Sequence, residues 1–266
     1  MITIKIGGSV VDEMHPSAVS DIKKVAECES VIIVHGGGKA VTSVCEQMGS
    51  EPRFVTSPSG IRSRYTDRET ARIFTMVMSG MVNKEIVRLL QQNGINAVGL
   101  SGADARTIRA RRKKRLIIVN EKGRKQAIDG GYTGKISEVN SGFIKGLLGQ
   151  GIVPVISPVA ISEEYEMLNV DGDRAAANVA GATGSDKVLF MTNVDGLMLD
   201  DRLVTGMSRQ EARDAMPKIG PGMEKKVLAS TEAIDMGVRT ALIASGRREN
   251  PISRAIAEEN CTVIRK

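Results

Sequence analysis

Short apolar runs alternate with longer amphipathic stretches along most of this chain. The runs are rich in valine and isoleucine, as expected of strands buried on both faces of a sheet, and they cover residues 2–6, 31–34, 97–100, 153–156, 188–191, 241–244 and 262–264. Between them, apolar residues recur at helical spacing over residues 17–26, 40–48, 67–78, 82–92, 141–149, 173–182, 208–215, 223–236 and 251–258. Pro251 suits a first helical turn, and Ser208 with Glu211 forms a capping box. This alternation predicts an α/β fold with a mainly parallel sheet.

The stretch between residues 107 and 136 breaks the alternation. Residues 115–120 and 125–128 have strand patterns and are separated by a short polar segment that contains Gly123. We therefore expect an antiparallel hairpin to be inserted there, on the face of the otherwise parallel sheet.

Composition narrows the class of protein. The chain has 266 residues, of which 41% are hydrophobic, and no apolar run approaches the ~20 residues that a membrane helix needs. The N-terminus enters a strand at once and lacks the features of a secretory signal. The 3 cysteines, Cys28, Cys45 and Cys261, fit neither a disulfide framework nor a CxxC metal site. We expect all of them to be buried, in the reducing cytoplasm.

Positive charge is concentrated in one segment. The net charge is +6, but residues 106–125 hold ten cations and one acid, so this segment carries +9 and the other residues together −3. The cations are Arg106, Arg109, Arg111, Arg112, Lys113, Lys114, Arg115, Lys122, Arg124 and Lys125. Such a local excess indicates an acidic partner, although a solvated basic hairpin would also account for it. No aromatic residue is interleaved with the cations, which disfavours single-stranded nucleic acid.

Two glycine motifs follow the first two expected strands. KIGGS (residues 5–9) ends the first strand, and HGGGK (residues 35–39) joins the second strand to a helix. Glycines let a backbone approach an anion closely, and amides at a helix N-terminus bind anionic groups. Neither motif is a Walker P-loop or a GxGxxG fingerprint, and each is weak alone. His35 closes a buried strand and is interpreted as a structural group.

Two further motifs precede helices in the second half of the chain. Asn169, Asp171 and Asp173 cluster within LNVDGDRAA (residues 168–176), where helix capping explains one acid but not the whole cluster. An EF-hand is excluded, because the required glutamate is absent. Lys225 and Lys226 follow GPGM (residues 220–223) at the start of a helix, where a solvated turn is the favoured explanation if the pair is taken alone.

Taken together and in this order, the four motifs resemble the amino acid kinase family, and within it the acetylglutamate kinase branch. The resemblance covers nearly the whole chain. It implies a three-layer αβα sandwich, use of ATP with Mg²⁺, and commonly a homodimer. It also implies one domain of residues 1–266, with an acceptor-binding N-terminal lobe of about residues 1–165 and an ATP-binding C-terminal lobe of about residues 166–266.

Two segments narrow the resemblance further. SGIRSRYT (residues 59–66) and GGYTGK (residues 130–135) are similar to the kinases that phosphorylate 2-aminoadipate or glutamate attached to LysW, a small acidic amino-group carrier protein, in lysine and arginine biosynthesis. The residues that would dock the carrier are Arg111, Arg112, Lys113 and Lys114.

The resemblance also assigns residues to the chemistry. It puts Lys5 and Lys226 on the transferring phosphoryl group, with Asp173 holding both lysines in orientation. The amides of Gly8 and Gly37 would face the phosphoryl oxygens. The acceptor carboxylate, with a reference pKa of ~4.3, is ionised at neutral pH and needs no general base.

Two sets of binding residues follow from the same resemblance. The acceptor would contact Gly37, Gly38, Arg62 and Asn169, and the guanidinium of Arg62 suits bidentate recognition of a carboxylate. The nucleotide would contact Gly7, Gly8, Asn193, Gly196, Gly222 and Met223. Family members often carry aspartate where this chain has Asn193. No residue is assigned as a dedicated metal ligand, because Mg²⁺ would arrive with the nucleotide.

Several alternatives stay open. A kinase of free N-acetylglutamate would use the same residues and mechanism. An isopentenyl phosphate or uridylate kinase would keep the fold with another acceptor, against which Arg62 and Asn169 argue. A non-catalytic amino-acid-binding regulator would keep the pocket without the chemistry, and a nucleic-acid-binding protein would use the basic hairpin.

Overall fold

The computed structural model describes residues 1–8 and 14–266 of the chain. Ser9, the last residue of the KIGGS motif, lies outside the described residues. Every strand and helix expected from the hydrophobic pattern is present, and most boundaries agree to within two residues.

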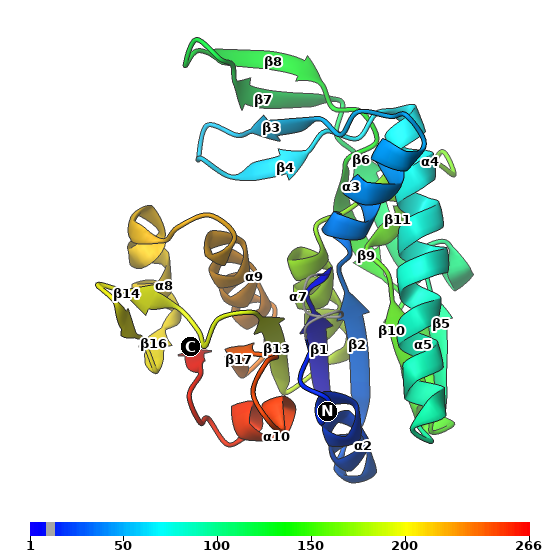
Figure 1. The fold of residues 1–266 in the computed structure, drawn as a ribbon, viewed down its shortest axis with the longest axis vertical. Coiled ribbons are helices and arrows are strands. Elements are labelled where there is room, and N and C mark those ends of the chain that lie inside the picture. The colour runs from blue at the N-terminus through cyan, green and yellow to red at the C-terminus, as the bar shows by residue number, and fades with distance from the viewer. Residues whose placement is uncertain (9–13) are drawn as a thin grey trace.

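Eight strands form the central sheet, in the order β16-β18-β17-β13-β1-β2-β10-β5 (Figure 1). They are β1 (Ile2–Ile6), β2 (Val31–His35), β5 (Ala97–Leu100), β10 (Val153–Ile156), β13 (Lys187–Thr192), β16 (Gly206–Ser208), β17 (Thr240–Ser245) and β18 (Thr262–Arg265). Neighbouring strands run parallel, except that β17 and β18 are antiparallel. The prediction of a mainly parallel sheet is therefore confirmed.

Helices cover both faces of this sheet. One layer contains α2 (Ala18–Cys28), α3 (Gly38–Gln47), α4 (Arg68–Thr75), α5 (Asn83–Gln92) and α10 (Pro251–Ile256). The other contains α6 (Ser141–Gly149), α7 (Gly172–Thr183), α8 (Arg209–Ala215) and α9 (Met223–Asp235), with the 3-10 turn η3 (Met216–Lys218) after α8. Each layer closes its own hydrophobic core against the sheet, so the three-layer αβα sandwich is confirmed.

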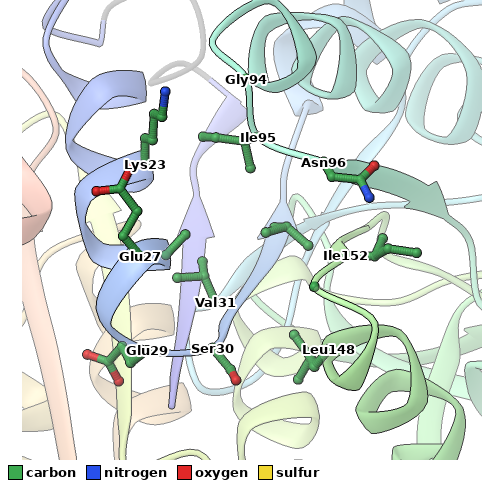
Figure 2. A pocket seen from close by; sticks show the side chains of 13 residues that line it. Lys23, Glu27, Glu29, Ser30, Val31, Gly94, Ile95, Asn96, Leu148 and Ile152 are labelled. Atoms are coloured by element: carbon green, nitrogen blue, oxygen red, sulfur yellow. The ribbon is translucent and has the colours of Figure 1, made fainter.

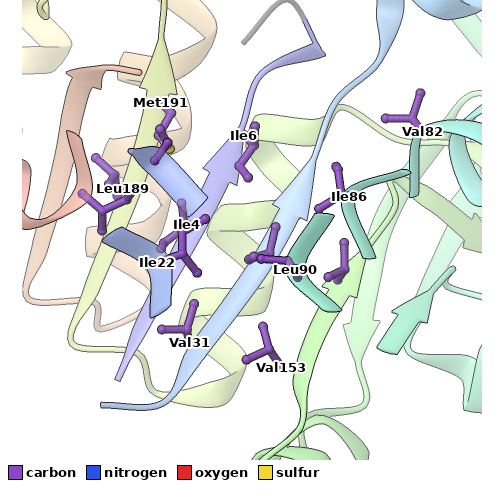
Figure 3. Close-up of a cluster of buried hydrophobic side chains, with 14 of the residues drawn as sticks. Ile4, Ile6, Ile22, Val31, Val82, Ile86, Leu90, Val153, Leu189 and Met191 are labelled. Carbon is purple, nitrogen blue, oxygen red and sulfur yellow. The ribbon is translucent and has the colours of Figure 1, made fainter. Parts of the chain in front are cut away.

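One of the two cores fixes the central strand (Figure 3). Ile4 and Ile6 of β1 pack there with Ile22 of α2 and Leu90 of α5, and each of the four side chains is at most 1% exposed. Burying a side chain of this size contributes roughly 1.5–3 kcal/mol. Because Lys5 lies between Ile4 and Ile6, this core also fixes the direction in which the lysine leaves the strand.

The connection between α4 and α5 departs from the prediction. The pattern predicts two separate helices, but the structure joins them through a π-helical segment, η1 (Met76–Val82). π-Helical turns are rare and occur frequently at functional sites. Hydrophobic spacing does not reveal such a turn, because it inserts a residue without interrupting the helix.

Two smaller sheets complete the fold. One has the order β12-β11-β6-β9 and contains β6 (Ile108–Arg112), β9 (Gly134–Val139), β11 (Val159–Ile161) and β12 (Met167–Asn169). The other has the order β4-β3-β7-β8 and contains β3 (Phe54–Thr56), β4 (Arg62–Arg64), β7 (Arg115–Val119) and β8 (Lys125–Asp129). The short hairpin of β14 (Met198–Leu199) and β15 (Arg202–Leu203) and the 3-10 turn η2 (Asp104–Arg106) lie in connections.

The antiparallel hairpin of β7 and β8 is present as expected, with Gly123 at φ +72° in its turn. Its predicted position is wrong, because it does not lie on the face of the parallel sheet. Thr56 of β3 pairs with Val119 of β7, so the hairpin extends the β3–β4 hairpin into a separate sheet. Figure 1 draws this sheet at the top, beyond the carboxyl ends of β1 and β2. Pairing two hairpin edges satisfies backbone groups that would otherwise be exposed.

The prediction for the cysteines is correct in part. Cys45 and Cys261 are buried, whereas Cys28 is exposed. Cys28 is in the last turn of α2, beyond Val25, the last buried residue of that helix. Within residues 1–8 and 14–266, no helix combines the length and apolar character needed to cross a bilayer.

Candidate active site

A hollow of about 250 Å³ lies at the amino ends of β2 and β10 (Figure 2). Its lining includes Val31 and Val153 at the strand ends and the charged side chains of Lys23 and Glu27. None of the four sequence motifs contributes to it. Ligand sites of open α/β sheets lie at the opposite, carboxyl ends of the strands, and there the motifs converge.

The two glycine loops pass each other at the carboxyl ends of β1 and β2. The backbone N–H of Gly36 donates to the carbonyl of Ile6 at 2.8 Å. A Cβ on Gly8 would lie 2.6 Å from the Cα of Gly37, so no side chain fits between the loops. Gly37 also precedes the first residue of α3, where backbone amides are free to bind an anion.

Lys5, Asp173 and Lys226 form a buried triad beside these loops. Lys5 Nζ lies 2.8 Å from Asp173 Oδ1, and Lys226 Nζ lies 3.4 Å from Asp173 Oδ2. Asp173 is only 5% exposed. A Cβ on Gly36 would lie 3.6 Å from Lys5 Nζ, so the ammonium group borders the second glycine loop. The triad therefore presents a net charge of one cation at the point where the loops meet.

The charges of the triad shift one another's protonation. Burial raises the pKa of the Asp173 carboxyl, but the charges of Lys5 and Lys226 outweigh this and hold the pKa below its usual value. Burial lowers the pKa of Lys226, and the charge of Asp173 opposes that effect. A carboxylate with a lowered pKa is a poor proton acceptor, so Asp173 acts as a fixed anion between two cations.

The start of α7 explains why Asp173 is free to contact the lysines. Asp171 caps this helix, because its Oδ1 accepts from the backbone N–H groups of Asp173 at 3.0 Å and Arg174 at 3.1 Å. Arg174 then donates through Nε to Glu232 of α9 at 2.9 Å, with a second contact from its Nη2. This bidentate pair holds α7 against α9, the helix that carries Lys226. Of the two acids in the motif, Asp171 therefore caps α7 and Asp173 contacts the two lysines.

A cavity of about 390 Å³ opens on the other side of Lys226. Five of the six residues predicted to bind nucleotide line it, namely Gly7, Asn193, Gly196, Gly222 and Met223, together with Lys226 itself. Gly8 is the exception and borders Gly37 instead. The loops after β1 and β13 and the start of α9 form the walls. Lys226 therefore connects the cavity with the triad.

The two segments that narrowed the resemblance meet at Asn169. The side-chain amide of Asn169 donates to Thr66 Oγ1 at 2.8 Å, and its backbone N–H donates to the carbonyl of Tyr132 at 2.9 Å. Tyr132 in turn donates from its N–H to the carbonyl of Thr66 at 2.7 Å. Gly131 has φ +57°, and a Cβ there would lie 2.3 Å from the same carbonyl, which explains the glycine.

The arginine that reaches the second glycine loop is Arg64. Its Nη2 donates to the carbonyl of Gly38 at 3.0 Å and to Thr42 Oγ1 at 2.7 Å. Arg62 is exposed, and its guanidinium carbon lies 4.6 Å from the centroid of the Phe54 ring. Among the described residues, the guanidinium of Arg62 has no hydrogen-bond or ion-pair partner, although its backbone pairs with Thr56 of β3. The resemblance assigned Arg62, and not Arg64, to the acceptor, although alternate residues of a strand share one face, which made both arginines candidates.

His35 is buried and has a partner at each ring nitrogen. Nδ1 lies 3.1 Å from the carbonyl oxygen of Gly36, and Nε2 lies 3.1 Å from Nδ2 of Asn83. Burial lowers the pKa of His35 to about 4, with smaller contributions in the same direction from the charges of Lys5 and Lys84. This neutral, satisfied ring agrees with the interpretation of His35 as a structural group.

The basic segment is divided between internal and exposed cations. Of the four residues predicted to dock a carrier, Arg112 pairs with Glu166 at 2.8 Å. Lys113 is half-buried, and burial lowers its pKa, with the charges of two neighbouring cations adding to the effect. Arg111 and Lys114 are exposed. The exposed cations for which the described residues supply no ion-pair partner are Arg106, Arg111, Lys114, Arg115, Lys122, Arg124 and Lys125.

Known proteins with similar sequences cover nearly the whole chain. The model of the amino acid kinase family matches residues 1–245. A Nitrosopumilus maritimus protein, provisionally named as a LysW-aminoadipate/LysW-glutamate kinase, is 74% identical over 99% of both chains. The LysW-aminoadipate/LysW-glutamate kinase of Metallosphaera sedula is 44% identical over 97% of both chains.

Solved structures agree on the architecture. The crystal structure of smu.665 from Streptococcus mutans superposes with a TM-score of 0.80 at 22% identity, covering 99% of this chain and 98% of that one. At this identity the likeness concerns the fold alone.

Proposed function

Because the chain belongs to the amino acid kinase family, we propose that it transfers the γ-phosphoryl group of ATP to the side-chain carboxylate of 2-aminoadipate or glutamate carried by LysW. The names of its relatives support this acceptor. One observation supports the chemistry above all: Lys226 lines the cavity of about 390 Å³ and also contacts Asp173, which holds Lys5 beside the glycine loops.

ATP occupies the cavity behind Lys226, with its adenine toward Gly222 and Met223 and its phosphates toward Gly7 and Gly8. Asn193 and Gly196 border the same space. Among residues 1–8 and 14–266, no group of three or more His, Cys, Asp or Glu side chains converges to hold a metal ion. Mg²⁺ would enter with the nucleotide and would supply neutralising positive charge at its phosphates.

The acceptor carboxylate attacks the γ-phosphorus in line, the bond to the leaving oxygen of ADP breaks, and an acyl phosphate forms. Because the acceptor is already an anion, the difficulty is charge repulsion and not proton removal. Lys5 and Lys226 balance the charge on the transferring group, and the amides of Gly8 and Gly37 donate to its oxygens. Asp173 keeps the two ammonium groups in position.

The acceptor amino acid lies over the second glycine loop, between Gly37 and Gly38 on one side and Asn169 on the other. Arg62 binds its free carboxylate from the β3–β4 hairpin, and Arg64 supports the loop from the same face. In this arrangement the N-terminal lobe (about residues 1–165) binds the acceptor, and the C-terminal lobe (about residues 166–266) binds ATP.

The carrier docks through the exposed part of the basic segment. Arg111 and Lys114 retain this role, whereas Arg112 and Lys113 support it from within, since one is paired and the other is half-buried. Lys122, Arg124 and Lys125 at the tip of the β7–β8 hairpin extend the basic surface. An acidic protein approaching this surface is steered toward the acceptor site.

The same proposal includes the setting of the enzyme. It acts in the cytoplasm, in lysine biosynthesis and, with glutamate as acceptor, in arginine biosynthesis. The proposal includes the homodimer that is common in this family, and β5 is one edge strand of the central sheet. Light scattering after size exclusion measures this assembly directly.

The decisive experiment compares three acceptors in one ADP-release assay: LysW-aminoadipate, LysW-glutamate and free N-acetylglutamate. We expect turnover of at least one LysW-bound acceptor and little of the free one. Efficient turnover of free N-acetylglutamate without binding of LysW would replace the proposed acceptor and leave the kinase chemistry in place. Absence of ADP release with every acceptor would refute the proposal.

A further inference from the structure

A buried polar contact lies directly behind the glycine loop of residues 36–38. His35 ends β2 and Asn83 begins α5, and both side chains are 0% exposed. Asn83 Nδ2 lies 3.1 Å from His35 Nε2 and also donates to the carbonyl of Val155 at 2.9 Å. His35 Nδ1 lies 3.1 Å from the carbonyl oxygen of Gly36. A chain of two contacts therefore runs from α5 to the first glycine of the loop.

The partners fix the direction of each hydrogen bond. Lys84 Nζ donates to Asn83 Oδ1 at 3.2 Å, so the amide oxygen faces the lysine and the amide nitrogen faces His35. The ring nitrogen Nε2 must then accept. Nδ1 carries the proton and donates to the carbonyl of Gly36. Replacing the amide donor would remove the group that selects this tautomer.

The helix that carries Asn83 touches the loop at a second place. A Cβ on Gly37 would lie 2.8 Å from Met78 Sδ and 3.2 Å from Val82 Cγ2. Met78 and Val82 belong to the π-helical segment, and the backbone N–H of Asn83 donates to the carbonyl of Met78. The π-helical segment therefore places Met78 and Val82 against Gly37 and, directly after them, Asn83 against His35, the residue that precedes the loop.

The sheet is also shaped around the Asn83 side chain. A Cβ on Gly99 of β5 would lie 1.9 Å from Asn83 Oδ1, so the strand has room for the amide only because residue 99 is a glycine. Three elements, β2, β5 and β10, therefore enclose one amide that contacts no reactant. Packing of this kind restricts the amide to one orientation.

We propose that Asn83 is a positioning residue, which acts through the His35 ring to hold the Gly36–Gly38 backbone where the acceptor and the phosphoryl oxygens bind. The inference rests on the role of this loop in the proposed function. The nucleotide cavity is lined by Gly7, by residues within 191–198, by residues 219–223 and by Lys226, and the side chain of Asn83 makes its hydrogen bonds to His35, Val155 and Lys84 instead. Substitution of Asn83 should therefore weaken acceptor binding and slow the transfer step, and it should leave the affinity for ATP unchanged.

The test measures kcat/KM for the LysW-bound acceptor, Kd for ATP and backbone hydrogen exchange in Asn83→Ala. We expect kcat/KM to fall at least tenfold, Kd for ATP to stay within twofold, and exchange at residues 36–38 to accelerate. The matched control is Thr3→Val, which removes a buried hydrogen bond of 2.8 Å to Ser185 in another part of the central sheet. It should lower the melting temperature and leave the acceptor kinetics unchanged.

Two further variants separate positioning from a general loss of stability. Because Asn83 acts through His35, Asn83→Ala should add little to the loss already caused by His35→Ala. Asn83→Ser keeps a smaller donor, provides a milder variant if Asn83→Ala folds poorly, and should retain more activity. Additive losses, equal losses in the serine and alanine variants, or unchanged acceptor kinetics would overturn the inference. If the unmodified protein phosphorylates no acceptor, the proposed function fails instead.

Discussion

Removing the anion of the Lys5–Asp173–Lys226 triad should destabilise the fold far more than removing its second cation. Asp173 faces two ammonium groups at 2.8 and 3.4 Å. At an effective dielectric constant near 20, these contacts correspond to about 6 and 5 kcal/mol of gross Coulomb attraction, much of which is offset by desolvation. Asp173→Ala leaves two buried ammonium groups without a partner. Breaking a buried pair in this way costs about 3–5 kcal/mol of unfolding free energy.

Lys226→Ala leaves the other two charges of the triad paired with each other. Asp173 keeps Lys5 as its partner, and the fold loses an ammonium group whose pKa is lowered by burial. We therefore expect the free energy of unfolding to change by no more than about 1 kcal/mol, because no charge is left unpaired. The transfer step should become slower, since a preorganised charge at the phosphoryl group contributes a factor of about 10²–10³ to kcat. The double variant Asp173→Ala/Lys226→Ala should be more stable than Asp173→Ala alone, and it should recover none of the lost activity.

The pH dependence of Asp173→Ala provides an internal check. Without the carboxylate, the pKa of Lys226 in the folded protein should lie further below its unfolded value. The resulting penalty is fully present while both states are protonated and disappears once the pH exceeds the unfolded pKa, so the variant should gain stability relative to the unmodified protein as the pH rises.

Urea unfolding at 25 °C measures the stabilities, and ADP release under saturating ATP measures kcat. Equal stability of Asp173→Ala and the unmodified protein would refute the electrostatic reasoning. Lys226→Ala with more than a tenth of the original kcat would refute the role of Lys226 in transfer.

Three other predictions concern pH, the nucleotide and the carrier. Because burial lowers the pKa of Lys226, kcat should decline on the alkaline side below the ordinary lysine value of about 10.4, and Lys226→Arg should move this decline to higher pH in a pH–rate profile. Gly196→Ala would bring a Cβ to 2.5 Å from Thr262 Oγ1, so calorimetry should detect weaker ATP binding; unchanged affinity would contradict the packing argument. Arg124→Glu with Lys125→Glu should raise KM for the LysW-bound acceptor, but not for ATP, and the increase should shrink at high salt. A salt-independent KM would argue against docking at the hairpin.

The regular elements could be predicted because burial leaves a local pattern. The residues of strand β1 alone predict it, because five buried residues follow one another. The residues of helix α8 alone predict it as well, because Ser208 and Glu211 form its capping box. The hairpin of β7 and β8 was readable for the same reason, since its strands and turn are adjacent in sequence. Its attachment to β3 was not, because one backbone pair between distant segments decides it.

Candidate residues of the site could be named from the order of the motifs, and the resemblance assigned Asp173 to the two lysines. The sequence did not show that Asp171 would cap α7 and leave the side chain of Asp173 free for that contact. Asp171 and Asp173 are two positions apart and chemically identical, and their roles differ because only Asp173 points between β1 and α9. Likewise, the pairing of β4 with β3 turns Arg64 toward Gly38.

By itself, therefore, the sequence determined the α/β alternation, the glycine-lined and lysine-bearing ends of the strands, and the concentration of charge in one segment. The tertiary structure alone decided that Lys226 joins the nucleotide cavity to the triad, that the basic hairpin extends a separate sheet, and that a π-helical turn brings Asn83 against His35. The physical reason is the range of the interactions. Periodicity and capping act between neighbours along the chain, whereas ion pairs, close backbone contacts and buried hydrogen bonds depend on residues that only the folded chain brings together.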